Sequence, residues 1–328
     1  MKNKESQNIN LGIIDLGYRE NEDSLSSFSS IIDYAVKAEE YNYSRFWLAE
    51  HHYTHIQNHP YTNPDILISL IAGSTERIKI ASAGTSINLY TPYATVTTYK
   101  LLNNLFHDRI ALGLSKGLPD SQYIQNASGV GIHNNYEKFQ ENFKEIIDLI
   151  ENEEENLKSK SILIPPYKGL KPELWHLSTN FNAFFSTLSH DLNHCISVFH
   201  NFGQDINNLP FNKEDIEKNK EEFYKIHHKY PKLIISLAII MDHTLEAAIK
   251  KQQDLVELAS ENFKDTFIMI PCTIDSLYEL LTNWKEKFGI DEFVIYDLAP
   301  TNDEKINNLK NISEKFSLIH AYETELSR

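Results

Sequence analysis

Short apolar runs alternate with stretches of helical periodicity along most of the chain. Residues 11–16 form an apolar run that predicts a strand, and apolar residues then recur at helical spacing through residues 25–36. The same succession of strand and helix repeats towards the end of the sequence. Strands are predicted at residues 11–16, 46–49, 78–87, 109–115, 174–177, 195–199, 233–241 and 293–298.

This alternation determines the expected fold class. Strands separated by helices pair in parallel, because the intervening helix returns the chain to the edge from which the first strand started. Eight such units in 328 residues fit a (β/α)8 TIM barrel better than an open, doubly wound sheet. We therefore expect a single α/β domain over residues 1–328, with the charged, proline-containing segment 151–171 as an insertion.

Composition and charge narrow the classes of partner. The chain has 46 Asp and Glu residues and 31 Lys and Arg residues, and the resulting net charge of −15 repels nucleic acid and anionic membranes. Two cysteines, Cys195 and Cys272, cannot form a disulfide framework or a CxxC metal motif. The polar segment 1–10 lacks the apolar core of a signal peptide, and the apolar run 233–241 is too short to cross a bilayer. We expect a cytoplasmic protein without nucleic-acid or membrane partners.

A cluster of ionisable side chains follows the second predicted strand. The apolar segment 46–49 ends in Glu50, His51 and His52, and His55 and His59 follow in the same loop. In parallel α/β folds, functional groups collect where the carboxyl end of a strand meets the next loop. Four histidines in nine residues allow two hypotheses, a metal site or a site that handles an anionic or oxygen-reactive intermediate.

Four ordered segments carry a resemblance to a known family. They are residues 45–52 (Arg-Phe-Trp-Leu-Ala-Glu-His-His), residues 75–80 (Thr-Glu-Arg-Ile-Lys-Ile), residues 89–92 (Leu-Tyr-Thr-Pro) and residues 108–117 (Asp-Arg-Ile-Ala-Leu-Gly-Leu-Ser-Lys-Gly). In this order and spacing they resemble the bacterial luciferase-like flavin-dependent monooxygenases. The resemblance is strongest between residues 11 and 125. Downstream of this region, it is confined mainly to the order of strands and helices. It implies a (β/α)8 barrel that uses reduced FMN.

His51 matches the catalytic histidine of that family. An imidazole just past a barrel strand can change protonation near neutral pH and offer a proton or hydrogen bond to oxygen-activated flavin. The alternative is a histidine that only packs in its loop. We interpret His52, His55 and His59 as surface or structural residues, and Glu50 as a group that orients an imidazole or as a buried hydrogen-bonding carboxylate.

Phosphate binding points to Lys116, because an acidic protein can hold the dianionic tail of FMN only with a local cation and nearby donors. Ser115 precedes it, and Ser178, Thr179 and Asn182 follow the fifth predicted strand. These hydroxyl and amide groups could reach phosphate, or they could cap the next helix. Family members usually carry arginine in place of Lys116 and a glycine-containing loop of small residues at 178–185, so this chain departs from the pattern at both places.

Two tyrosines complete the candidate site. Tyr18 and Tyr90 fall in loops at predicted strand ends, where together with Glu50 they would line a substrate pocket. No dinucleotide-binding fingerprint is present. The resemblance therefore implies a two-component monooxygenase that receives reduced FMN from a separate NAD(P)H:flavin reductase and oxidises a small organic substrate.

Other hypotheses remain open from the residues alone. One is a metal-dependent hydrolase barrel that uses the four histidines between 51 and 59. Another is a non-catalytic partner subunit with the same fold. Within the leading hypothesis, no resident metal is expected, a deazaflavin could replace FMN, and either a homodimer or a heterodimer is expected.

Overall fold

The computed structural model describes residues 9–20, 22–50, 63–116, 135–179, 181–200, 212–258 and 267–318. The strands are β1 (Asn10–Asp15), β2 (Arg45–Leu48), β3 (Lys79–Ser82), β4 (Thr85–Ser86), β5 (Ile110–Ser115), β6 (Glu173–Ser178), β7 (Asn193–Ser197), β8 (Leu233–Met241), β9 (Met269–Cys272) and β10 (Glu292–Asp297). The helices are α1 (Ser24–Glu40), α2 (Pro64–Ser74), α3 (Pro92–Leu105), α5 (Asn135–Glu151), α6 (Glu153–Lys160), α7 (Asn182–Ser186), α8 (Lys213–His227), α9 (Leu245–Leu258), α11 (Ile274–Phe288) and α12 (Asn302–Phe316).

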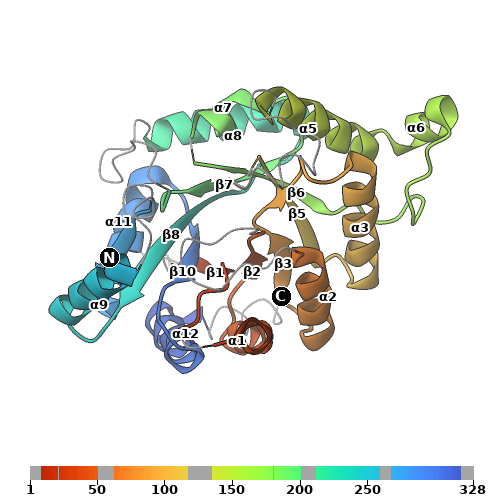
Figure 1. Cartoon of the computed structure of the whole chain (residues 1–328). Coiled ribbons are helices and arrows are strands. Elements are labelled where there is room, and N and C mark those ends of the chain that lie inside the picture. The colour runs from red at the N-terminus through yellow and green to blue at the C-terminus, as the bar shows by residue number, and fades with distance from the viewer. Residues whose placement is uncertain are drawn as a thin grey trace, which may run out of the picture.

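Eight parallel strands close into a barrel that the helices surround (Figure 1). The ring runs β1, β2, β3, β5, β6, β7, β8 and β10, and the β10 to β1 ladder closes it. The predicted (β/α)8 barrel is therefore confirmed, and each of its eight strands lies where the apolar pattern placed it. Within the described residues, no helix is both long enough and apolar enough to span a membrane.

Two strand boundaries differ from the prediction. The run predicted as one strand over residues 78–87 is divided into β3 and β4 at the cis peptide Ala83–Gly84. A Cβ on Gly84 would lie 2.5 Å from Leu177 Cδ1 and 2.9 Å from the carbonyl oxygen of Gly113, so the chain approaches β5 and β6 closely here. Strand β9 was not predicted, because Pro271 interrupts its apolar run.

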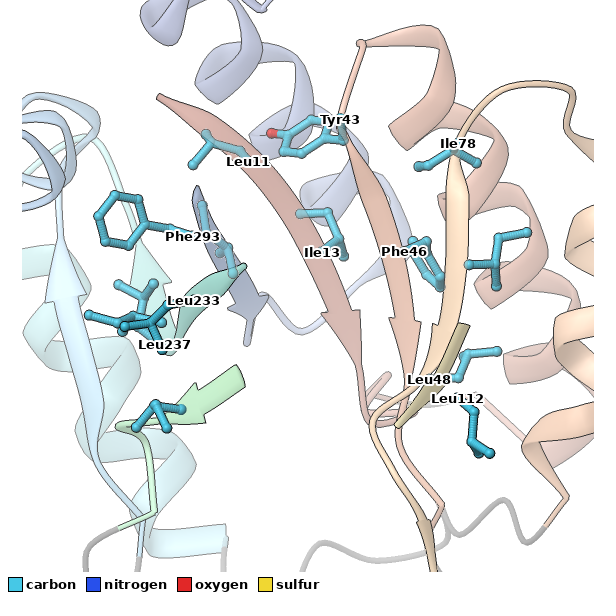
Figure 2. Packing of buried hydrophobic residues seen from close by; sticks show 14 of the residues in the cluster. Leu11, Ile13, Tyr43, Phe46, Leu48, Ile78, Leu112, Leu233, Leu237 and Phe293 are labelled. Atoms are coloured by element: carbon cyan, nitrogen blue, oxygen red, sulfur yellow. The ribbon is translucent and has the colours of Figure 1, made fainter. Parts of the chain in front are cut away.

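The outer faces of the strands pack against the helices. Figure 2 shows Leu11 and Ile13 of β1 and Phe46 and Leu48 of β2 in this layer, and all four side chains are buried. The hydroxyl of Tyr43, which precedes β2, donates to the carbonyl oxygen of Leu309 in α12. Alternation along each strand then directs the intervening residues into the barrel.

The guanidinium of Arg45 and two tryptophan side chains fill the part of the barrel near the amino-terminal ends of the strands. The guanidinium of Arg45 lies 4.7 Å from the ring centre of Trp175 and 5.7 Å from that of Trp47, and it pairs with Glu292. Gly12 makes room for it, because a Cβ there would lie 2.6 Å from Arg45 Cγ. These side chains occupy the amino-terminal part of the barrel, so a ligand must bind at the opposite end, where the strands finish.

The segment expected as an insertion, residues 151–171, begins at the last residue of α5. It contains helix α6 and the cis Pro165–Pro166 bond. Lys100 of α3 anchors it through a buried ion pair with Glu153 and a hydrogen bond to the carbonyl oxygen of Ile164. The segment is thereby tied to the outer helix layer at the side of α3 (Figure 1).

Candidate active site

The carboxyl ends of the barrel strands bring together most of the described residues that the sequence singled out. Every ladder of the barrel is parallel, so residues that follow β1, β2, β3, β5 and β6 in the chain meet at one rim. Small residues occupy the inward-facing positions near this rim: Ala49 just past β2, Ala83 just past β3 and Gly113 in β5. Gly113 is required by packing, since a Cβ there would lie 2.1 Å from the carbonyl oxygen of Ser82.

Glu50 is a buried carboxylate that joins two parts of the rim. It is 8% exposed, and its Oε2 accepts a hydrogen bond of 2.7 Å from the backbone N–H of Ser86 at the end of β4. Its Oε1 accepts one of 2.7 Å from the hydroxyl of Tyr90. Burial and the adjacent Glu50 carboxylate raise the pKa of Tyr90, so this phenol remains a donor at neutral pH. Two of the three residues expected in the substrate pocket are thus in direct contact.

Tyr18, the third, lies on the loop after β1 and is 6% exposed. Burial raises its pKa to about 12. The ammonium group of Lys305, buried on α12, lies 5.9 Å from the ring centres of both Tyr18 and Tyr296. Burial lowers the pKa of Lys305 to about 8, and its Nζ donates to the backbone carbonyl oxygen of Asp297.

A buried ion pair lies beside Tyr18. Arg19 Nη2 is 2.7 Å from Asp15 Oδ2, and both side chains are almost completely buried. Burial opposes ionisation of Asp15, but Arg19 and then Lys305 outweigh it and lower the pKa of Asp15. Breaking such a pair would leave an uncompensated charge in the interior, so the loop that carries Tyr18 is firmly held.

The residues expected to bind phosphate end two neighbouring strands. Ser115 ends β5, and Lys116 follows it with an exposed side chain. Ser178 ends β6, the strand that pairs with β5, and Thr179 follows it. Asn182 begins α7 and is exposed.

The N-cap residue of α7 is Phe181 rather than Ser178, Thr179 or Asn182. The side chain of Phe181 makes no capping hydrogen bond. Along β6, Ser178 lies on the same face as His176, towards the helices, whereas Ser115 lies on the inner face of β5 with Ala111. The lysine and the hydroxyl groups therefore approach the rim from both faces of the sheet.

His51, His52, His55 and His59 lie outside the described residues. Elsewhere, across the described ranges, no group of three or more His, Cys, Asp or Glu side chains could hold a metal ion.

His200 is a candidate that the sequence did not single out. It lies just past β7, and its Nδ1 is 2.7 Å from the hydroxyl oxygen of Ser197. Its ring centre is 4.4 Å from that of Phe199 and 6.1 Å from that of Phe267. The available signal was its position, because His200 directly follows the predicted strand 195–199 and therefore stands at the expected rim.

Comparison with known proteins identifies the family. The sequence model of the luciferase-like monooxygenase family matches residues 9–184, more than half of the chain. The chain belongs to the luciferase-like monooxygenase family. The match covers β1 to β6 and all the candidate residues named in the sequence, but not His200.

Relatives of this luciferase-like chain agree on the fold. The N-acetyl-S-alkylcysteine monooxygenase of Bacillus subtilis is 26% identical over 200 residues, which are 60% of this chain and 59% of that protein. The curated relatives that the chain matches are aligned over about half of their length. Among solved structures, apo-MsnO8 superposes with a TM-score of 0.74 at 17% identity, over 95% of this chain and 98% of that one.

A flavin-bound structure has the same fold. It is the oxygenating constituent of 3,6-diketocamphane monooxygenase from Pseudomonas putida, a type II Baeyer–Villiger monooxygenase in complex with FMN. It superposes with a TM-score of 0.66 at 15% identity, over 94% of this chain and 98% of that one. At this identity the likeness establishes the fold alone.

Proposed function

We propose that the chain is a flavin-dependent monooxygenase that uses reduced FMN and O2 to oxidise a small organic substrate. The observation that carries the proposal is the family match over residues 9–184. It spans the part of the barrel whose strand ends hold Glu50, Tyr90 and Lys116. The names of relatives, which include a monooxygenase acting on N-acetyl-S-alkylcysteine and an FMN-bound oxygenating subunit, point in the same direction.

The donor set at β5 and β6 fits a phosphate group. Lys116 provides a cation, and Ser115, Ser178 and Thr179 provide hydroxyl donors on two neighbouring strand ends. Asn182 adds an amide. We assign the phosphate of FMN to this group. Because lysine lacks the forked geometry of arginine, its contribution would be a single charge-assisted contact.

His51 is assigned the catalytic role because it directly follows Glu50. The carboxylate of Glu50 is fixed by Ser86 and Tyr90, so the backbone leading into His51 starts from an anchored position. Reduced FMN, when bound, supplies the electrons that activate dioxygen. The imidazole would hold or deliver a proton there, which fits a group with a pKa near neutrality. Glu50, Tyr18 and Tyr90 would line the substrate side.

A separate NAD(P)H:flavin reductase completes the proposed system, since the sequence carries no dinucleotide fingerprint. A dimer is favoured by apolar side chains on the neighbouring helices α2 and α3. Ile66 and Leu70 are 58% and 49% exposed, and Leu101 and Leu105 are 47% and 59% exposed. Two free buried thiols suit the reducing cytoplasm, where we place the protein.

The experiment combines the purified chain with NADH, FMN, a flavin reductase and ¹⁸O2, with dodecanal or N-acetyl-S-benzylcysteine as probe substrates. NADH alone should support no oxygen uptake, and addition of the reductase should introduce ¹⁸O into product. Independently of the probe, excess chain should change the rate at which O2 oxidises reduced FMN. An oxidation rate that is the same with and without the chain would contradict the proposal.

A further inference from the structure

Ser197 and His200 form a pair at the end of β7. Ser197 is the last residue of that strand, and His200 Nδ1 lies 2.7 Å from its Oγ. Whichever atom donates, the contact holds Nδ1 at Ser197 and fixes the plane of the imidazole. An oriented imidazole at the carboxyl end of a barrel strand stands where ligands of this fold bind.

Aromatic rings surround this imidazole. Phe199, Phe267 and Tyr296 have ring centres 5.2–6.1 Å apart, and they come from the segment just past β7, the approach to β9, and β10. Phe199 and Tyr296 are buried, at 2% and 4% exposed, and they form the base of the cluster. His200 and Phe267 are partly exposed and form its outer surface.

Backbone hydrogen bonding joins the segment of Phe199 and His200 to the segment of Phe267. The N–H of Ile268 donates to the carbonyl oxygen of Phe199 at 2.7 Å, and His200 pairs with Phe267 in an antiparallel bridge. Beyond this bridge, β9 continues along β8 from Ala238 to Met241, past the point where β7 ends. The aromatic surface is therefore part of the barrel wall rather than of an independent loop.

This surface lies across the barrel from the β2 end. In the closed ring of eight strands, β7 is four strands away from β2 in either direction. The wall near Glu50 presents the small residues Ala49 and Ala83, whereas the wall at β7 and β10 presents rings. If a flat cofactor packs against the small residues, the aromatic wall remains available to bind the substrate.

We infer that His200 contacts the substrate and that Ser197 positions the imidazole of His200. The substrate is a flat, aromatic molecule with a hydroxyl or carbonyl group directed at that imidazole. This inference rests on the proposed monooxygenase function. Rings of Phe267 and His200 suit a planar apolar body through stacked or edge contacts, and the imidazole supplies one directional polar contact.

The test uses a matched pair of probes, 2-naphthol and decahydro-2-naphthol, which share a hydroxyl and a bicyclic frame but differ in aromaticity. The full chain is labelled with ¹⁵N and ¹³C histidine, and the His200 signal is assigned by its loss in His200→Gln. We expect 2-naphthol to shift the His200 signal and to bind roughly three- to tenfold more tightly than the saturated probe. His200→Gln should weaken 2-naphthol binding by about fivefold, as expected for one lost hydrogen bond.

Ser197→Ala tests the positioning role. It should change the ¹⁵N shifts that report the tautomer of His200 and weaken 2-naphthol binding by about threefold. The control is His243→Gln, an exposed histidine just past β8, which should leave probe binding unchanged. Anaerobic titration with reduced FMN should give the same affinity, within about twofold, in all variants.

Three results would overturn the inference. They are a His200 signal that neither probe moves, equal binding of the two probes, and unchanged ¹⁵N shifts in Ser197→Ala. Failure of reduced FMN to bind, with the 2-naphthol effects intact, would instead defeat the proposed function and leave His200 as a ligand contact.

Discussion

The hydroxyl of Tyr90 donates to Glu50 Oε1 at 2.7 Å, and this bond links the end of β2 to the loop before α3. Glu50 Oε2 at the same time accepts from the backbone N–H of Ser86. Both carboxylate oxygens are therefore used for structure. The residue immediately before His51 is held on two sides.

We predict that Tyr90→Phe and Glu50→Gln are coupled. Each should lower the free energy of unfolding by about 1 kcal/mol or more, because a buried polar atom loses its partner. The double variant should lose less than the sum, which urea unfolding measures. Strict additivity of the two changes would show that the bond contributes nothing. Glu154→Gln, at an exposed carboxylate of α6, should have little effect and serves as the control.

Stability should fall in mild acid because of His176 and His194. These residues lie on the outer faces of β6 and β7, with ring centres 5.7 Å apart. The Nδ1 atom of each is buried and has no hydrogen-bond partner among the residues that the structure describes. Burial lowers the pKa of His176 to about 4, and burial together with His176 lowers that of His194 to about 3. The unfolded chain, with ordinary histidine pKa values, binds protons first as the pH falls below about 6.5.

The contribution of the pair is complete above pH 6.5 and decreases towards the folded-state pKa values. At pH 5 each histidine should cost about 2 kcal/mol relative to pH 7.5. Urea unfolding at the two pH values measures this loss. In His194→Gln the pH dependence should shrink by about half. An unchanged dependence in that variant would assign the acid sensitivity to other groups. Phe143 and Phe184, which contact these imidazoles, carry no charge that could offset it.

The barrel was predictable because its signal is repeated. Eight apolar runs separated by helical periodicity leave few alternatives, and one misplaced boundary does not change the class. Strand β9 was missed because a proline within a short run normally argues against a strand. The interruption of residues 78–87 at Gly84 depends on the approach of Leu177, which is 93 positions away in the sequence and carries no local mark.

The candidate site was predictable only in part. Glu50, Tyr90 and Lys116 stand at strand ends that the pattern already located. Their partners were not predictable, because the contact between Glu50 and Tyr90 spans 40 residues and depends on how β3 and β4 end. His200 was missed for a related reason. Its aromatic neighbour Phe267 belongs to the unpredicted approach to β9.

Lys116→Met should weaken binding of reduced FMN by about tenfold while leaving folding intact, since a charge-assisted contact to phosphate is lost. Lys116→Arg should hold or tighten binding. Anaerobic fluorescence titration measures both. Lys158→Met, at an exposed lysine of α6, is the matched control. Equal affinities for all variants would show that the phosphate binds elsewhere.

His51→Ala should reduce product formation by roughly 10²–10⁴, the range for a general acid–base group, while flavin affinity changes only a few-fold. Hydrogen peroxide release should rise as oxygen activation and substrate oxidation become uncoupled. Single-turnover oxidation, with peroxide and product measured together, separates these effects. His59→Ala should do little. A comparable loss at His59 would favour the hypothesis of a metal cluster in this loop.

The central claim is that this barrel binds reduced FMN rather than a catalytic metal. The direct measurement is an anaerobic titration of the purified chain with reduced FMN, with elemental analysis of the same sample and a reduced deazaflavin titrated in parallel. We predict a dissociation constant of micromolar order for reduced FMN, as suits a diffusible cofactor, and no stoichiometric metal. Binding of only the deazaflavin would show that a deazaflavin, and not FMN, is the cofactor. One zinc or iron per chain, with no binding of reduced FMN, would contradict the central claim and support a metal-dependent hydrolase.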